Sequence, residues 1–356
     1  MTSYQALLAA AIESITPTDP AAEERAWARL DSLTKPPKSL GRLEEIAAQV
    51  ARIQDTEKPK VPSKAILLMA GDHGVVAEGI SPFPQDVTWQ MVANIAAGGA
   101  AINQIARSVG ADVTVYDIGV ARNLDKFPGI EHDNVARGTA NMAVGPAMTR
   151  EQCAQAVLVG VSAVRAVVKR GVKLVGTGEM GIGNTTSAAA LTAAFADVEP
   201  ATVVGRGTGL DEAGVSHKAD VVARALAIND VASLDPLGVL AAVGGLEVAA
   251  LAGVVLGAAV ERITVVSDGF ISGAATLAAI AMCPAARDYV LPSHLSAEPG
   301  HRVVLDHLGL APVLELDMRL GEGTGAALAM GIVDAACQMM SGMATFAEAG
   351  VAGAEE

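Results

Sequence analysis

From residue 65 onward, short apolar segments alternate with longer helical segments, and this alternation restricts the possible folds more than any other feature of the chain. The apolar runs have the length of buried strands, and helical periodicity marks the segments between them. The strands are expected at 65–70, 113–118, 173–176, 263–267, 289–291 and 313–316, and the helices at 86–95, 101–109, 150–170 and 246–260. The pattern predicts an α/β fold with a mostly parallel, Rossmann-like sheet and helices on both of its faces.

The first sixty residues follow a different pattern. Amphipathic helices are predicted at 4–15, 21–33 and 40–54, and the prolines of 59–62 indicate a linker. A helix predicted at 324–343 is expected to return to them. We therefore expect a small helical domain made of residues 1–60 and 330–356, and an α/β domain over 61–329 that carries any active site.

The composition excludes several classes of protein. Hydrophobic residues make up 51% of the 356 residues, enough for a large core, which excludes a disordered chain. The formal charge is −14 and only 3% of residues are aromatic, so the chain lacks the basic surface and stacking side chains that nucleic acids require. Cys153, Cys283 and Cys337 form no CxxC pair, and the N-terminus does not resemble a signal peptide. These features predict a cytoplasmic protein with reduced cysteines.

The longest stretch with almost no charge, 237–260, is long enough to cross a membrane. Gly244, Gly245 and Glu247 interrupt it, and no aromatic or basic residues flank it as they flank membrane spans. We therefore expect a buried helix and no membrane segment. Other helices rich in alanine and glycine are expected to pack closely against the sheet or against a second subunit, at 187–196, 273–283 and 325–333.

Several predicted strands run directly into loops that contain glycine and acidic residues. In parallel sheets such loops gather at one edge, where ligands bind. The loop at 178–186 precedes an alanine-rich helix, so it is either an anion-binding turn or a tight turn capped by Thr185 or Thr186. Its glycine spacing matches neither the P-loop nor the dinucleotide-binding fingerprint.

Three other loops contain residues suited to chemistry. The glycine-rich loop at 205–209 is followed by Lys218, which is either a charge for a phosphate or a solvated lysine. Asp268 follows a strand, where a carboxylate can accept hydrogen bonds from a ribose, and the lack of an acidic pair argues against a magnesium-diphosphate substrate. Glu322 lies between two glycines and is either a helix-capping residue or a general base.

The turn at 71–74 contains Asp72 and His73, but none of the six histidines has the spacing of a metal-binding motif. We expect these two residues to form a turn and hydrogen bonds, and we expect no metal site.

Considered together, the loops resemble one family, the nicotinate-nucleotide–dimethylbenzimidazole phosphoribosyltransferases. The similar segments include "AGDHGVVAEGISPFPQDVTWQMV", "GEMGIGNTTSAAAL" and "LDMRLGEGTGAALAM", and they occur in order along nearly the whole chain. They cover 35–44, 70–92, 178–191, 204–211, 244–247, 267–275, 293–301 and 316–330.

The resemblance implies transfer of the 5-phosphoribosyl group from nicotinate mononucleotide to 5,6-dimethylbenzimidazole, with inversion at the anomeric carbon. It implies a homodimer in which one subunit helps to close the site of the other. It implies Glu322 as general base and Glu179 as a second acidic residue. The remaining residues that it implies are Gly181, Thr185, Gly207 and Lys218 for the phosphate, Asp268 and Ser296 for the ribose, and Ser81, Phe83 and Gln90 for the benzimidazole.

General chemistry agrees with this reaction. Nicotinate leaves as a neutral ring from a pyridinium cation, so it needs no strong acid, while the benzimidazole gains positive charge as it attacks. A carboxylate that accepts its ring N–H removes that charge, and Glu322 is suited to this role. A second carboxylate, Glu179, is expected to stabilise an oxocarbenium-like sugar. Because no diphosphate leaves, we expect neither metal nor cofactor.

Three other functions compete with this prediction. The first is the same phosphoribosyl donor with a purine, a phenol or water as acceptor. The second is a non-catalytic nucleotide-binding protein. The third is a nicotinamide-dependent oxidoreductase, which only the glycine loop at 178–186 favours.

Overall fold

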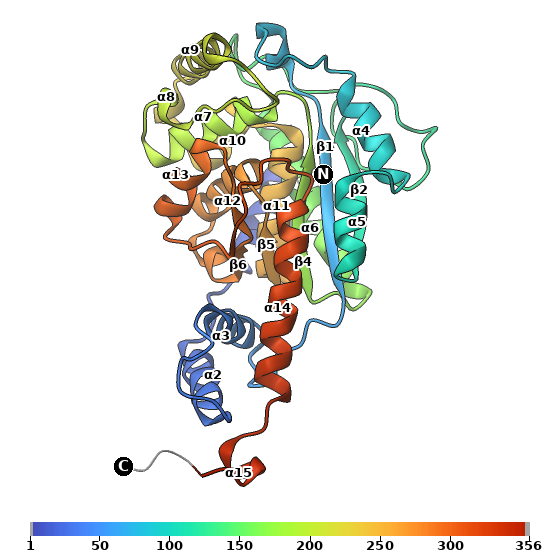
Figure 1. Ribbon diagram of the computed structural model, residues 1–356. Helices are drawn as coiled ribbons and strands as arrows, with labels where there is room; N and C mark the ends of the chain where they lie inside the picture. Colours follow the sequence, from blue (N-terminus) through green and yellow to red (C-terminus); the bar gives the residue numbers. More distant parts are fainter. Residues whose placement is uncertain (1–2, 353–356) are drawn as a thin grey trace.

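The computed structural model describes residues 3–352. Its central feature is a six-stranded sheet with the strand order β3-β2-β1-β4-β5-β6, in which every neighbouring pair is parallel (Figure 1). This is the order of the Rossmann fold, in which the direction of strand addition reverses between the two central strands. The strands are β1 (Lys64–Gly71), β2 (Ala111–Gly119), β3 (Ile130–His132), β4 (Leu174–Met180), β5 (Thr264–Ser267) and β6 (Val290–Pro292).

Helices cover both faces of the sheet, as the sequence predicts. The helices are α1 (Tyr4–Glu13), α2 (Pro20–Ser32), α3 (Arg42–Gln54), α4 (Val87–Ala96), α5 (Ala101–Ser108), α6 (Arg150–Lys169), α7 (Asn184–Ala196), α8 (Pro200–Val203), α9 (Glu212–Ile228), α10 (Pro236–Val243), α11 (Leu246–Val260), α12 (Phe270–Met282), α13 (Pro299–Leu308), α14 (Thr324–Gly342) and α15 (Phe346–Ala349). Short 3-10 helices are η1 (Gly74–Glu78), η2 (Val231–Ser233) and η3 (Pro284–Tyr289).

The side chains of β1 contribute to two hydrophobic cores, one on each face of the sheet. Successive side chains of a strand point to opposite faces, and β1 is buried along its whole length. One face packs into a core with α6, α11 and α12, and the other into a core with α3, α5 and α14. The first core receives Ala65, Leu67 and Met69, and the second receives Ile66, Leu68 and Ala70.

Five predicted strands are confirmed in the main sheet, but the one predicted at 313–316 lies elsewhere. It forms β8 (Leu314–Glu315), which pairs only with β7 (His294–Leu295) in a small second sheet. The sequence analysis did not predict β7 or β3. Each is only two or three residues long, so its pairing depends on neighbouring loops more than on its own apolar pattern.

The prediction of one buried helix over 237–260 is wrong in one respect. Both Gly244 and Gly245 adopt extended backbone, so the stretch forms two buried helices, α10 and α11. In the described part of the chain, α6 is the single helix long and apolar enough to cross a membrane. Half of that apolar stretch is buried, and α6 packs against α11 and α1, as expected of a core helix.

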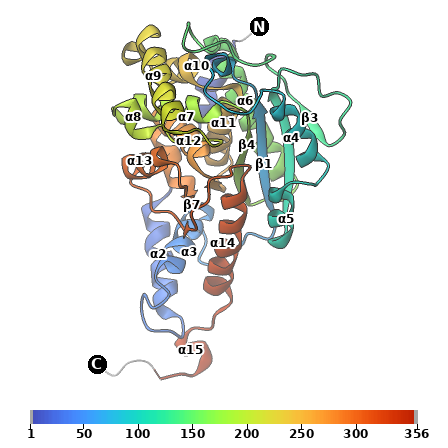
Figure 2. The same ribbon diagram turned by 45° about the horizontal axis from the view of Figure 1, so that its top comes forward.

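The N-terminal helices occupy two places. In Figures 1 and 2, α2, α3, α15 and the end of α14 form an extension below the sheet, and the 324–343 helix does return to α3 as predicted. In contrast, α1 packs against α6 on the main body, where the backbone N–H of Tyr4 donates to Glu151 Oε1 at 2.7 Å. The division of the chain into domains at residue 60 stays a prediction.

The helices α6 and α11 touch through their backbones. A Cβ atom added to Gly253 would lie 1.9 Å from the carbonyl oxygen of Val157, and one added to Gly160 would lie 1.9 Å from that of Ala250. Small residues therefore allow close packing between α6 and α11, both of which contact β1, as well as being expected to do so in the helices at 187–196, 273–283 and 325–333.

We expect Gly253→Ala to lower the free energy of unfolding by about 1–3 kcal/mol, because its methyl group meets rigid backbone and forces the helices apart. The matched control is Gly342→Ala, since an added Cβ at Gly342 has open space. Thermal unfolding at a fixed scan rate and protein concentration measures both variants. Equal melting temperatures for Gly253→Ala and the wild type would contradict the packing argument.

Candidate active site

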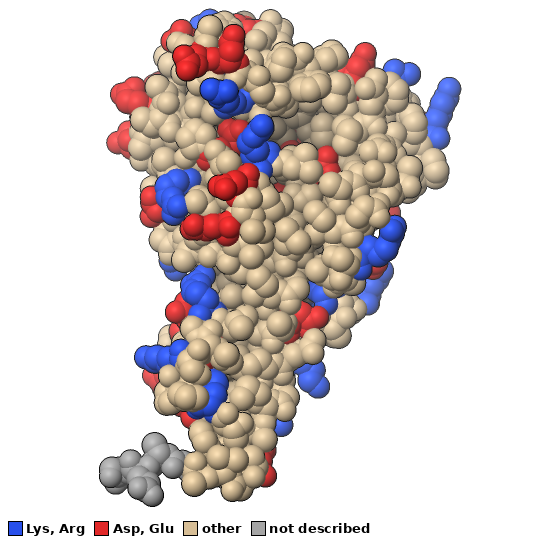
Figure 3. Space-filling model, in the orientation of Figure 1, with Lys and Arg blue, Asp and Glu red and all other residues tan. Residues whose placement is uncertain are grey.

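A cavity of about 310 Å³ lies where the C-terminal ends of β4, β5 and β6 meet, next to the point where strand order reverses. Parallel α/β sheets bind ligands at this position because the loops after the strands diverge there. Figure 3 shows the molecule hollowed in its upper part, with basic side chains beside the hollow. The predicted convergence of the glycine- and acid-containing loops is confirmed.

Eight of the eleven residues selected from the sequence line this cavity. They are Phe83, Glu179, Gly181, Thr185, Gly207, Asp268, Ser296 and Glu322. Two others lie one contact away: Lys218 Nζ donates to Thr185 Oγ1 at 2.7 Å, and Ser81 Oγ lies 3.2 Å from Thr208 Oγ1. Gln90 is exposed on α4 and does not line the cavity, where Val87 and Met91 of the same helix are found instead.

Glu322 is held in an unusual backbone conformation. Its φ of 62° is left-handed, which a residue with a Cβ atom rarely adopts, and the glycines on both sides are left-handed too. The carboxylate of Asp268 fixes this turn, because Oδ2 accepts from Gly323 N at 3.1 Å and Oδ1 accepts from Ala326 N at 2.8 Å. Asp268 therefore joins the end of β5 to the first turn of α14.

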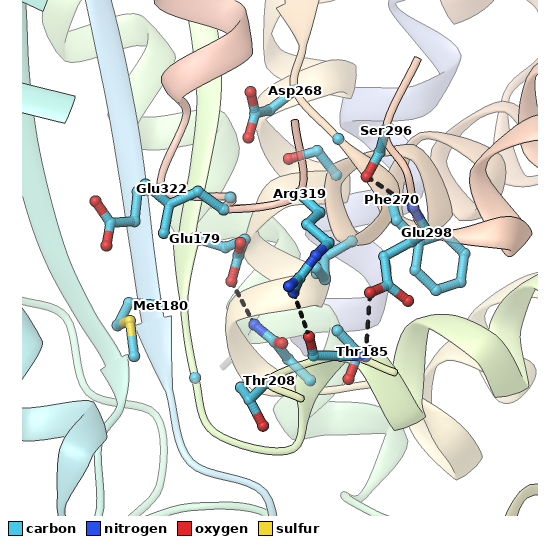
Figure 4. A pocket seen from close by; sticks show the side chains of 18 of the residues that line it. Glu179, Met180, Thr185, Thr208, Asp268, Phe270, Ser296, Glu298, Arg319 and Glu322 are labelled. Atoms are coloured by element: carbon cyan, nitrogen blue, oxygen red, sulfur yellow. Dashed lines mark hydrogen bonds between the residues drawn. The ribbon is translucent and has the colours of Figure 1, made fainter. Parts of the chain in front are cut away.

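The carboxylate of Glu322 is buried and has capacity to accept a proton. The side chain points away from Asp268, toward the part of the cavity that Met180 lines (Figure 4). Its Oε2 has no hydrogen-bond partner within the described chain. Burial raises the pKa of Glu322 above the usual carboxyl value, Asp268 raises it further, and the backbone N–H of Ile102 at the start of α5 lowers it. These are the properties of a general base.

Glu179 lies at the end of β4 in a different hydrogen-bonding environment. Its side chain accepts a hydrogen bond from Asn184 Nδ2, and it contacts the backbone at Gly321, where an added Cβ would lie 2.1 Å from Oε1. Burial, followed by the charge of Asp268, raises the pKa of Glu179 to about 8. At pH 7 this residue is mostly a neutral acid, which can donate a hydrogen bond but does not carry a full negative charge.

The turn after β4 is suited to an anion. Gly183 is left-handed and precedes α7, whose N-terminus carries the partial positive charge that favours an anion, although the N–H groups of Asn184 and Thr186 donate to the carbonyls of Gly181 and Gly183. The ammonium group of Lys218 reaches this end of α7 through its bond to Thr185. Burial lowers the pKa of Lys218 to about 8, so it is mostly charged at pH 7.

The glycine-containing turn after β4 packs against a cluster of buried polar side chains. His73 Nε2 lies 2.5 Å from Glu247 Oε1, and Asp72 Oδ2 accepts from Ala121 N at 2.8 Å. A Cβ added to Gly181 would lie 3.2 Å from Glu247 Oε1, so Gly181 packs closely against the Glu247 carboxylate of this cluster. The structural, hydrogen-bonding role predicted for Asp72 and His73 agrees with these contacts.

One wall of the cavity is apolar. It lies on the side of α4 and consists of Phe83, Val87, Met91, Met180 and Leu320. The cavity thus combines an anion-binding turn, buried acidic groups and an apolar wall, an arrangement that fits a phosphorylated sugar beside a flat heterocycle.

Sequence reasoning missed several polar residues of the site. Asn184 donates to Glu179, Glu298 Oε1 accepts from Gly207 N at 3.0 Å, and Arg319 Nη1 donates to Gly207 O at 3.0 Å (Figure 4). All three occur within the segments on which the family resemblance rests, but spacing alone does not reveal their partners, which are the Glu179 carboxylate for Asn184 and the backbone of Gly207 for Glu298 and Arg319.

The comparisons with known proteins point to one enzyme family. A family model described as a phosphoribosyltransferase matches residues 15–351. The nicotinate-nucleotide–dimethylbenzimidazole phosphoribosyltransferase of Desulforamulus reducens is 51% identical over 346 residues, which cover 97% of this chain and 99% of the relative. The enzyme of the same name from Geobacter metallireducens is 50% identical over 345 residues, covering 97% and 98%.

A solved structure shares the whole fold. The crystal structure of CobT from Thermus thermophilus superposes with a TM-score of 0.90 at 49% identity, and the match covers 94% of this chain and 99% of that one. With about half of its residues identical to those of these enzymes over nearly its full length, the chain belongs to the nicotinate-nucleotide–dimethylbenzimidazole phosphoribosyltransferase family.

Proposed function

We propose that this phosphoribosyltransferase transfers the 5-phosphoribosyl group of nicotinate mononucleotide to 5,6-dimethylbenzimidazole, forming α-ribazole 5′-phosphate and nicotinate. The observation that carries the proposal is the buried Glu322 carboxylate, which has an unpartnered oxygen in a cavity that also contains an anion-binding turn. The names of the similar enzymes support the choice of the two substrates.

The donor binds through its phosphate. The turn from Gly181 to Gly183, Thr185 and Lys218 surround one end of the cavity, and a helix start together with an ammonium group attracts a dianion. The ribose then lies toward Ser296 and Glu179. Because Glu179 is mostly neutral at pH 7, we assign it a hydrogen-bond donor role toward the sugar instead of the carboxylate role expected from the sequence.

The acceptor lies against the apolar wall that includes Phe83 and Met180, with one ring nitrogen directed at the anomeric carbon. As that nitrogen forms the new bond, the C–N bond to nicotinate breaks and its electron pair neutralises the pyridinium ring. Glu322 accepts the proton from the other ring nitrogen. Attack from the face opposite the leaving group inverts the anomeric carbon.

The oligomer and location are also proposals. Leu316 and Leu320 are more than half exposed near the cavity, and Phe83 is 47% exposed, which is consistent with a homodimer whose second subunit covers the acceptor side. All three cysteines are buried and unpaired, consistent with a cytoplasmic location.

The direct test mixes the purified protein with nicotinate mononucleotide and dimethylbenzimidazole, and then identifies products by mass spectrometry. We expect nicotinate and α-ribazole phosphate in equal amounts. Adenine and phenol in place of dimethylbenzimidazole test the other acceptors. Release of nicotinate without dependence on any acceptor would overturn the transferase proposal in favour of a hydrolase.

Glu322→Gln is expected to lower kcat by about 10²–10⁴-fold, because an amide cannot accept the proton that leaves the acceptor ring. The KM for nicotinate mononucleotide should change little, since the donor phosphate binds at the other end of the cavity. Steady-state kinetics measure both constants. The control is Glu315→Gln, which removes an exposed carboxylate. Full turnover by Glu322→Gln would exclude Glu322 as the base.

The pH dependence of the reaction should have two limbs. The value of kcat should rise as Glu322 loses its proton, and because burial raises its pKa, this limb lies at higher pH than for an exposed glutamate. The value of kcat/KM for the donor should fall above about pH 8, where Lys218 loses its positive charge and Glu179 becomes negative. Initial rates measured from pH 5 to pH 9.5 test both limbs. A kcat/KM that stays constant through the alkaline range would contradict the role of Lys218.

A further inference from the structure

A buried carboxylate beside the anion-binding end of the cavity has no role in the mechanism above. Glu298 is only 6% exposed and lines both the main cavity and a neighbouring one of about 470 Å³. An acidic group next to a bound phosphate would repel it. Its presence at this place therefore requires a physical reason.

The side chain of Glu298 fixes a turn that borders the cavity. Its Oε1 accepts from Gly207 N at 3.0 Å, while Oε2 is buried and has no hydrogen-bond partner in the described residues. A Cβ added to Gly205 would lie 2.0 Å from Oε2, so the turn at 205–207 lies directly against the carboxylate. Pro299 follows Glu298 and begins α13, which gives the side chain a rigid base.

Lys218 lies on the other side of the same turn. A Cβ added to Gly207 would lie 3.3 Å from Lys218 Nζ and 3.0 Å from Thr185 Oγ1. Gly207 thus separates Glu298 from the ammonium group that is expected to bind the phosphate. Arg319 also holds this turn, since its guanidinium donates to Gly207 O (Figure 4).

The charges around the turn explain why an acidic residue is tolerated there. The charged groups are Lys218 on α9, the exposed Glu212 at the start of α9, Glu298 before α13, and Arg206 and Arg319 from the two adjoining loops. Burial disfavours the ammonium form of Lys218, and the negative charge of Glu298 opposes that effect by raising the pKa of Lys218. Thr185 accepts one Lys218 N–H, which leaves two for a ligand.

We propose that Glu298 is a positioning residue for the phosphate of the donor: it fixes the turn at 205–207 through Gly207 and places a negative charge on the opposite side of that turn from the Lys218 ammonium group. The inference rests on the proposed binding of a phosphorylated donor and adds a group that does not touch it. Glu298 acts on affinity for the donor through Lys218 and takes no part in the bond changes.

Two substitutions separate the two parts of this role. Glu298→Gln keeps an oxygen that can accept from Gly207 N but removes the charge. Glu298→Asp keeps the charge but shortens the side chain by one methylene, so the contact with Gly207 weakens. The control is Glu212→Gln, which removes one negative charge from an exposed residue that lines the neighbouring cavity.

The experiment measures kcat and the KM for nicotinate mononucleotide from pH 6.5 to pH 9.5. In Glu298→Gln, the pH at which KM begins to rise should fall by about one unit, because an opposite charge nearby shifts a pKa by at least that much. If the pKa of Lys218 falls from about 8 to about 7, KM at pH 8.5 rises about eightfold. The value of kcat with saturating donor should stay within about twofold.

In Glu298→Asp, KM should be higher at every pH while the midpoint of its rise stays that of the wild type. The donor's own phosphate ionises near pH 6, equally for every variant, and so cancels in the comparison. Calorimetric titration with nicotinate mononucleotide alone repeats the test without turnover, so the outcome is independent of which acceptor the enzyme uses. An unchanged midpoint in Glu298→Gln, or the same midpoint shift in Glu298→Asp and Glu298→Gln, would overturn the proposal.

Discussion

The contact between Asp268 and the start of α14 is the constraint on which the site depends. A fully buried carboxylate is costly unless donors replace the water it has lost, and here the free N–H groups of a helix N-terminus supply them. The contact joins β5 to α14, holds the turn that contains Glu322, and brings a negative charge close to two other acids. Burial is the largest cause of the raised pKa of both Glu179 and Glu322, and the charge of Asp268 adds to it in each case.

The two glutamates of the cavity differ in their surroundings. Glu179 faces both burial and the charge of Asp268, and its pKa of about 8 leaves it protonated at neutral pH. Glu322 is buried to a similar extent, and the N–H of Ile102 at the start of α5 partly offsets the effect of burial on its pKa. Two buried acids in different hydrogen-bonding surroundings are what the proposed mechanism needs, in which one donates a hydrogen bond and the other accepts a proton.

Much of this arrangement could be predicted from the sequence, because strands that end in glycine and acidic residues specify which loops meet. Gly181, Thr185, Asp268 and Glu322 were found in this way. The contacts of Glu298 and Arg319 with Gly207 could not be, since each depends on loops from distant parts of the chain meeting at a defined distance. Gln90 is the opposite case, a residue selected from the sequence that is not in the site. It lies in a segment that resembles the family, but the orientation of α4 leaves its side chain exposed. Similarly, the amphipathic pattern of α1 identifies a helix but not its partner, which is α6.

The left-handed backbone at Glu322 has a consequence for how such a chain changes over time. A side chain in this conformation costs about 1 kcal/mol relative to glycine, so the residue that we propose as the base lowers the stability of the fold. Selection for the reaction and selection for folding thus oppose each other at one codon. A descendant that no longer carried out the reaction would gain stability by acquiring glycine at position 322. That substitution would therefore be an early sign of lost activity, before other changes in the fold.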